Sequence, residues 1–228
     1  MKKHIPNCIT LLNLLSGCIG VTMAFHQAYD YALLCMLLSA LFDFCDGLAA
    51  RLLHAYSNIG KELDSLADMV SFGFLPGVLA YQLLLEGNAG SIVPYFGFLI
   101  PLFSALRLAK FNVDERQTSN FIGLATPANA LFWGSLASAY HTQIAPLPYV
   151  IMGICLVMSL LLVAEIPFFS LKFKSLRWKD NQVRFVFLLG CLPIVVCFIK
   201  GAFVWVIGWY ILLALCSAIK ERMSPTQG

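Results

Sequence analysis

The chain has 228 residues, of which 60% are hydrophobic and 12% charged, whereas an ordinary soluble domain is about half apolar and about a quarter charged. Its mean hydropathy is +0.81, and no polar stretch between the apolar segments is long enough to form a separate soluble domain. The 15 Lys and Arg against 12 Asp and Glu are too evenly balanced to suggest nucleic-acid binding. We therefore expect a single all-α integral membrane domain over residues 1–228.

About eight apolar segments approach the length of about 20 residues that crosses a bilayer. We expect helices, because these segments lack the alternation of a membrane barrel and must satisfy their own backbone hydrogen bonds. The expected spans are 5–25, 30–53, 60–85, 92–111, 127–140, 148–168, 183–199 and 202–219.

The positively charged residues predict an orientation. Every Lys and Arg except Lys200 falls on the side of the expected spans that holds both termini. Because cytoplasmic loops carry the excess of Lys and Arg, we expect both termini and the turn after the second span to be cytoplasmic, in a bacterial inner membrane.

Four aspartates interrupt the second and third apolar segments on either side of the turn that joins them. Asp43 and Asp46 are three residues apart and Asp64 and Asp68 are four apart, so each pair shares one face of a helix. An aspartate at the centre of a membrane helix costs about 2.5 to 3.5 kcal/mol. Such residues usually mark ion or substrate sites, and the short turn predicts that the two pairs meet as a four-carboxylate cage.

This acidic cluster predicts a metal site. From Asp43 to Asp68 the formal charge is minus three, and carboxylate oxygens suit Mg²⁺ or Mn²⁺. Two such ions about 3.5 to 4 Å apart would clamp a phosphoryl group during in-line displacement. The small residues Gly47, Ala50 and Gly60 would let a bulky ligand reach the backbone, although small residues are also common where membrane helices pack together.

Eight fixed positions in this region form one pattern, which reads Asp43-x2-Asp46-Gly47-x2-Ala50-Arg51-x8-Gly60-x3-Asp64-x3-Asp68. With it the chain resembles the CDP-alcohol phosphotransferases. The resemblance implies a membrane enzyme, usually a homodimer, that cleaves a CDP-linked lipid with an alcohol and releases CMP. It also implies a six-helix catalytic core, here residues 1–170, followed by a C-terminal helical hairpin over residues 171–228.

The resemblance also implies roles for single residues. Asp43, Asp46 and Asp64 resemble metal ligands for two ions, and Asp68 resembles both a ligand and the general base. The positions that resemble contacts of the CDP-lipid are Gly47, Ala50, Arg51, Ser57 and Gly60. Asn7 and Thr10, one turn apart at the same membrane face, are further candidates for the CDP-lipid, with helix packing as an equal explanation.

The wider sequence resembles the phosphatidylserine synthase branch of this family, in blocks at 6–13, 62–73, 107–112 and 123–128. This branch implies CDP-diacylglycerol and L-serine as substrates, within a surrounding of membrane lipids. The carboxylate of serine needs a cationic partner, for which Arg107 and Lys110, with Asn112 beside them, are the best candidates. Both cations are explained equally well as anchors at the cytoplasmic surface.

Two alternatives stay open. A sibling enzyme would use glycerol 3-phosphate or inositol phosphate, whose additional dianion favours a denser arginine cluster than this sequence contains. A divalent-cation transporter would also place carboxylates in the membrane. Transporters, however, commonly carry inverted repeats and midplane sites, whereas these acids gather at one membrane face.

Overall fold

The computed structural model describes residues 4–87, 92–113, 121–170, 177–178 and 181–223. Its helices are α1 (Ile5–Phe25), α2 (Tyr29–Leu52), α3 (Asn58–Asp68), the π-helix η2 (Met69–Phe74), α4 (Leu75–Glu86), the 3-10 helix η3 (Val93–Phe98), α5 (Leu99–Val113), α6 (Thr126–Ile144), α7 (Pro148–Val163), α8 (Gln182–Cys197) and α9 (Ala202–Met223). Strands β1 (Phe121–Ile122) and β2 (Pro167–Phe168) form one antiparallel pair. The expected helical architecture is confirmed, with this small strand pair as an addition.

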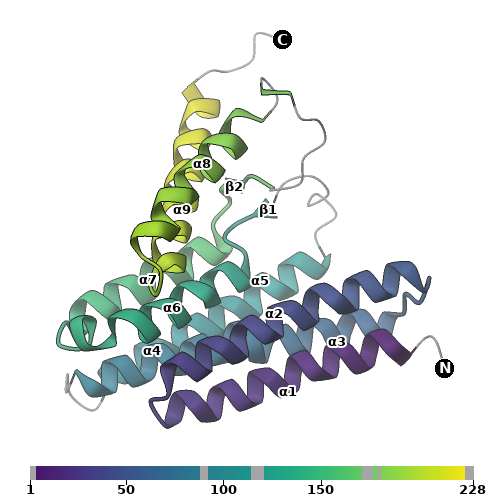
Figure 1. Ribbon diagram of the computed structural model, residues 1–228, viewed down its shortest axis with the longest axis horizontal. Helices are drawn as coiled ribbons and strands as arrows, with labels where there is room; N and C mark the ends of the chain where they lie inside the picture. The colour runs from purple at the N-terminus through teal and green to yellow at the C-terminus, as the bar shows by residue number, and fades with distance from the viewer. Residues whose placement is uncertain (1–3, 88–91, 114–120, 171–176, 179–180, 224–228) are drawn as a thin grey trace.

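The helices from α1 to α7 run along the long axis of the molecule, whereas α8 and α9 cross them (Figure 1). Helix α9 packs on α6 and β2, and α8 packs mainly on α9. Two hydrogen bonds fasten α9, one from Trp205 Nε1 to the Tyr140 hydroxyl at 3.0 Å and one from the Tyr210 hydroxyl to the Phe169 carbonyl at 2.9 Å. The division of the chain at residue 170 stays a prediction, because residue 171 lies outside the described residues.

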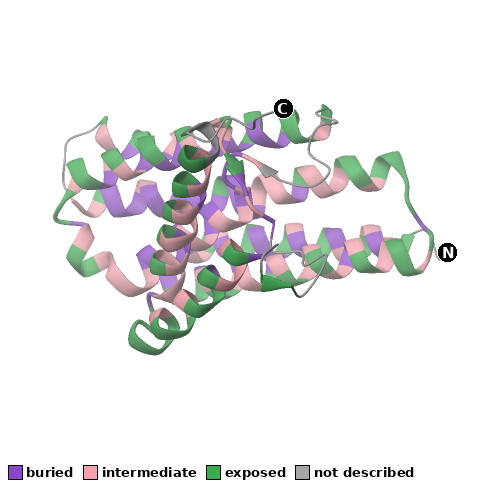
Figure 2. Cartoon of the chain, turned by 90° about the horizontal axis from the view of Figure 1, so that it is seen from above, coloured by how far each residue is buried: buried purple, intermediate pink, exposed green. Residues whose placement is uncertain are grey.

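The described residues contain 5 helical stretches that are long and apolar enough to cross a membrane, at Ile5–Phe25, Tyr29–Leu52, Asn58–Glu86, Val93–Val113 and Ala202–Lys220. Exposed residues line the outer faces of the helices (Figure 2), and many are large and apolar, such as Phe44 at 66% and Leu102 at 62% exposure. A surface of this kind suits lipid better than water. The chain is therefore built as an integral membrane protein.

The fifth and sixth expected spans differ most from the observed helices. The fifth, expected at 127–140, is the longer α6. The sixth was expected to continue to Phe168, but α7 ends at Val163 and the backbone is extended at Ala164, with ψ 140°. Pro167 explains the early end, because a proline disfavours the helical conformation of the residue before it and has no N–H to donate.

The turn between α2 and α3 is fixed by local hydrogen bonds. His54 adopts a left-handed conformation with φ 49°, and the next amide, Ala55 N–H, donates to the Ala50 carbonyl at 2.9 Å, which closes the end of α2. Ser57 then caps α3, its hydroxyl accepting from the Gly60 amide at 3.0 Å. The predicted hairpin is thereby formed, and it sets the carboxyl end of α2 beside the start of α3.

The core surrounds α4, which is buried on nearly every side, with Leu75, Leu79 and Leu83 fully buried. Helix α1 lies very close to η2, the segment directly before α4. A Cβ on Gly17 would lie 2.2 Å from Ser71 Oγ. A side chain at residue 17 would therefore push these two elements apart.

Candidate active site

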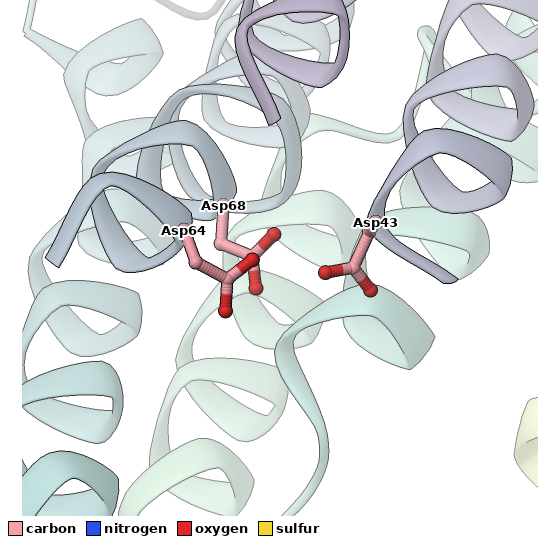
Figure 3. Close-up of side chains that lie close together, drawn as sticks. All are labelled: Asp43, Asp64 and Asp68. Carbon is pink, nitrogen blue, oxygen red and sulfur yellow. The ribbon is translucent and has the colours of Figure 1, made fainter. Parts of the chain in front are cut away.

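Three of the four aspartates come together between α2 and α3. Asp43 faces Asp64 and Asp68 (Figure 3), and one oxygen from each carboxylate lies within 4.8 Å of the other two. Asp64 Oδ1 is buried without a hydrogen-bond partner among the described residues. Carboxylates this close repel one another unless a cation neutralises them, and hard oxygen donors are the ligands that Mg²⁺ and Mn²⁺ prefer. The donor set therefore fits a divalent ion.

Asp46 lies beside this group rather than within it. Its Oδ2 accepts a hydrogen bond of 2.6 Å from the Thr10 hydroxyl of α1, and its side chain lines a neighbouring cavity together with Asp64. The structure thus shows three clustered carboxylates and a fourth held by Thr10, and the role of Asp46 as a ligand stays a prediction.

The cavity next to the aspartates has a volume of about 220 Å³ and is formed by α1, α2, α3 and the α2–α3 turn. It brings together six of the seven residues expected to contact the CDP-lipid, namely Asn7, Thr10, Gly47, Ala50, Ser57 and Gly60. The described lining does not include the seventh, Arg51, which is exposed on the last turn of α2. It does include Tyr56 and Lys61, which the sequence pattern did not single out.

The two glycines of this cavity differ in their surroundings. A Cβ on Gly47 would meet no atom of the described residues within 4 Å, whereas a Cβ on Gly60 would lie 3.0 Å from Ser57 Oγ and 3.1 Å from Asn7 Oδ1. Gly47 therefore leaves space free for a ligand, and Gly60 allows close packing of α3 on α1.

The three residues expected to bind serine have different surroundings. Arg107 is only 8% exposed, donates to the Thr126 hydroxyl at 3.0 Å and lies close enough to Asp68 for their charges to attract. Asn112 instead joins α5 to α3, since its Nδ2 donates to Ser65 Oγ at 2.8 Å. Lys110 is exposed. Among their described interactions, only that of Arg107 involves an aspartate of the cluster.

Asn13 is a residue of the site that the sequence analysis missed. It is fully buried, and its Nδ2 donates to Asp68 Oδ1 at 3.3 Å. The pattern that could have found it is a repeat of three residues in an otherwise apolar helix, since Asn7, Thr10 and Asn13 all lie on one face of α1.

Comparisons with known proteins match the whole site region. A family model described as CDP-alcohol phosphatidyltransferase matches residues 3–215. The chain is 33% identical over 170 residues to the CDP-diacylglycerol–serine O-phosphatidyltransferase of Bacillus subtilis. The aligned residues make up 73% of this chain and 90% of that protein. It is 30% identical over 197 residues to the protein of the same name from Helicobacter pylori, covering 83% of this chain and 80% of that one.

A third similar protein comes from an archaeon. The archaetidylserine synthase of Methanothermobacter thermautotrophicus is 34% identical over 143 residues, which is 60% of this chain and 58% of that protein. The matched family depends on divalent metal ions, and the cluster of Asp43, Asp64 and Asp68 could hold one. The family model matches residues 3–215, and Asp46 and Asp64 of the family pattern line one cavity beside the cluster that Asp64 forms with Asp43 and Asp68, so the chain belongs to the CDP-alcohol phosphatidyltransferases.

Proposed function

We propose that the chain transfers the phosphatidyl group of CDP-diacylglycerol to the hydroxyl of L-serine, giving phosphatidylserine and CMP. The observation that carries this proposal is the continuity of the cavity with the aspartates, because Asp64 belongs to both. The names of the Bacillus subtilis and Helicobacter pylori relatives support serine as the acceptor.

The cavity suits the head of the CDP-lipid. Gly47 leaves open space on one wall, so a nucleotide diphosphate would approach the backbone of α2 there. Asn7 and Ser57 offer polar side chains, and Lys61 offers a positive charge to a phosphate. Arg51, exposed at the end of α2, would contact the diphosphate from the rim.

The aspartates would hold two divalent ions, Mg²⁺ or Mn²⁺. Asp43, Asp64 and Asp68 supply the clustered oxygens. Asp46 lines the neighbouring cavity together with Asp64. When bound, the ions would neutralise the charge of the diphosphate and stabilise the charge that develops on it.

Asp68 would act as the general base. The serine hydroxyl gives its proton to the Asp68 carboxylate while its oxygen attacks the phosphorus that carries diacylglycerol, and the bond from that phosphorus to the oxygen of CMP breaks as CMP leaves. Arg107 is buried and lies close enough to Asp68 for their charges to attract. It would bind the carboxylate of serine.

The location of the reaction is also part of the proposal. The excess of Lys and Arg at the end of the bundle that holds the site favours a cytoplasmic active site in a bacterial inner membrane. The family resemblance further supports a homodimer.

The test is release of CMP by the purified protein from CDP-diacylglycerol with Mn²⁺ or Mg²⁺. L-serine, glycerol 3-phosphate, inositol phosphate and a sample without acceptor are compared, each with and without EDTA. We expect only serine to accelerate the release of CMP and EDTA to stop it. Acceleration by a phosphorylated alcohol instead would identify a sibling enzyme, and no release with any acceptor would favour a divalent-cation transporter.

A further inference from the structure

We propose that Asn13 selects the acceptor, with its side-chain oxygen receiving the ammonium group of L-serine. The inference rests on the proposed function and adds a residue that recognises the amino group, which neither the family pattern nor Arg107 provides.

Asn13 is held rigidly at the junction of three elements. Its backbone carbonyl accepts hydrogen bonds from Ser39 of α2 and from Ser71 of η2, both at 3.1 Å. One turn further along α1, Gly17 lies directly against Ser71. The backbone of Asn13 therefore cannot shift without moving α2 or η2.

The amide of Asn13 has one half engaged and one half available. Nδ2 donates to Asp68 Oδ1 at 3.3 Å, whereas Oδ1 is buried without a hydrogen-bond partner among the described residues. A buried acceptor without a partner is unfavourable. Because Nδ2 and Oδ1 belong to one rigid amide, this acceptor lies next to the carboxylate that we propose as the general base.

The covalent structure of serine matches this arrangement. Its hydroxyl and its ammonium group are on neighbouring carbons, so a hydroxyl that donates to Asp68 brings the ammonium group close to Asn13. An ammonium group has three donors and no acceptor, which suits the free oxygen of Asn13. Glycerol 3-phosphate and inositol phosphate have no ammonium group and offer this acceptor only a neutral hydroxyl on the neighbouring carbon, whose hydrogen bond is weaker than that of a charged donor.

The experiment removes the amide from the protein and the ammonium group from the ligand, separately and together. The KM for L-serine and the inhibition constant of 3-hydroxypropanoate, which is serine without its ammonium group, are measured for the natural protein and for Asn13→Ala. We expect the KM for serine to rise about tenfold or more, as for a lost hydrogen bond to a charged group. The inhibition constant of 3-hydroxypropanoate should stay nearly unchanged.

A second variant separates recognition from positioning of the base. Asn13→Asp keeps an oxygen towards the ammonium group but replaces the donor to Asp68 with a second oxygen. Both variants lose the donor to Asp68 and should lower kcat, but only Asn13→Ala should also raise the KM for serine. Ser16→Ala is the matched control, because Ser16 is buried one turn away on α1 and its hydroxyl donates to the Cys35 carbonyl at 2.8 Å. Calorimetric binding of CMP with Mn²⁺ reports whether each variant keeps its nucleotide site.

Equal rises in the KM for serine and the inhibition constant of 3-hydroxypropanoate would overturn the inference, since Asn13 would then only orient Asp68 or hold a water molecule. An unchanged KM for serine in Asn13→Ala would also overturn it. Failure of the natural protein to use serine at all is a different result, which would refute the proposed function itself.

Discussion

The aspartates of the site are oriented by neutral side chains of α1. Thr10 donates to Asp46 of α2 and Asn13 donates to Asp68 of α3. Helix α1 therefore supplies a hydrogen bond to an aspartate of each of these two helices. Partners of this kind fix the direction of a ligand oxygen, and their loss typically weakens metal binding about 10- to 100-fold.

Thr10→Val tests this role, because valine keeps the shape of threonine and removes only the hydroxyl. We expect the concentration of Mn²⁺ that gives half-maximal CMP release to rise about tenfold or more. The control is Thr22→Val on the same helix, where an exposed hydroxyl donates to the Ile19 carbonyl. An unchanged Mn²⁺ requirement in Thr10→Val would show that Asp46 does not depend on Thr10.

Asp68→Asn tests the general base. The amide cannot take the proton of the acceptor, so kcat should fall about 100-fold or more. Three aspartates would remain for the metal, and binding of the CDP-lipid, measured with Mn²⁺ by calorimetry, should be retained in part. Full turnover by this variant would assign the base to another residue.

Gly17 and Gly47 differ in the space around the position that a Cβ would take, which separates a glycine needed for helix packing from one that leaves room for a ligand. Gly17 has Ser71 Oγ at 2.2 Å and Ser71 Cα at 2.9 Å from the position of a Cβ, whereas Gly47 has no described atom within 4 Å. Gly17→Ala should lower the unfolding temperature in detergent, by an overpacking cost of about 1 to 3 kcal/mol. Gly47→Ala should leave that temperature unchanged and raise the KM for CDP-diacylglycerol several-fold.

The β1–β2 pair fastens the start of α6 to the end of α7. Gly123, with φ +79°, lies where a Cβ would meet the Leu162 carbonyl oxygen at 2.4 Å. Gly123→Ala should therefore destabilise the fold by about 2 kcal/mol or more and displace Thr126 from Arg107. Gly153→Ala on α7, whose Cβ would meet no described atom within 4 Å, should be neutral or slightly stabilising. Thermal unfolding in detergent measures both variants.

Across the whole molecule, hydropathy and spacing predicted most of the helices and the meeting of α2 with α3. They did so because long apolar runs must be helical in lipid and because side chains three or four residues apart share a helix face. The π-helix η2 was not predictable. It packs on α1 through the contact of Gly17 with Ser71, and this contact joins parts of the chain that are distant in sequence. Two-residue strands carry no periodic pattern. The path of the chain after α2 depends on the left-handed His54, which composition does not reveal.

The clustered carboxylates couple metal binding to the stability of the whole protein. Mn²⁺ at about 100 times its dissociation constant should stabilise the fold by about 2.7 kcal/mol, which raises the unfolding temperature. Asp64→Asn should make this rise smaller and, by removing repulsion from Asp43 and Asp68, increase the unfolding temperature of the metal-free protein. Asp30→Asn, an exposed aspartate near the start of α2, is the control and should behave like the natural protein.

The π-helix η2 accommodates one extra residue within the third span. A turn closed by i to i+5 hydrogen bonds contains one residue more than an α-helical turn, and η2 lies between the aspartates of α3 and the buried α4. Deleting a single residue between Met69 and Phe74 would allow a regular α-helix there and would leave the direction of α3 relative to α4 nearly unchanged, because an α-helical turn needs one residue fewer. A deletion in the regular helix α4 would instead rotate Asp64 and Asp68 by about 100° relative to the buried side chains that follow it, so η2 should tolerate the loss of one residue better than α4 does.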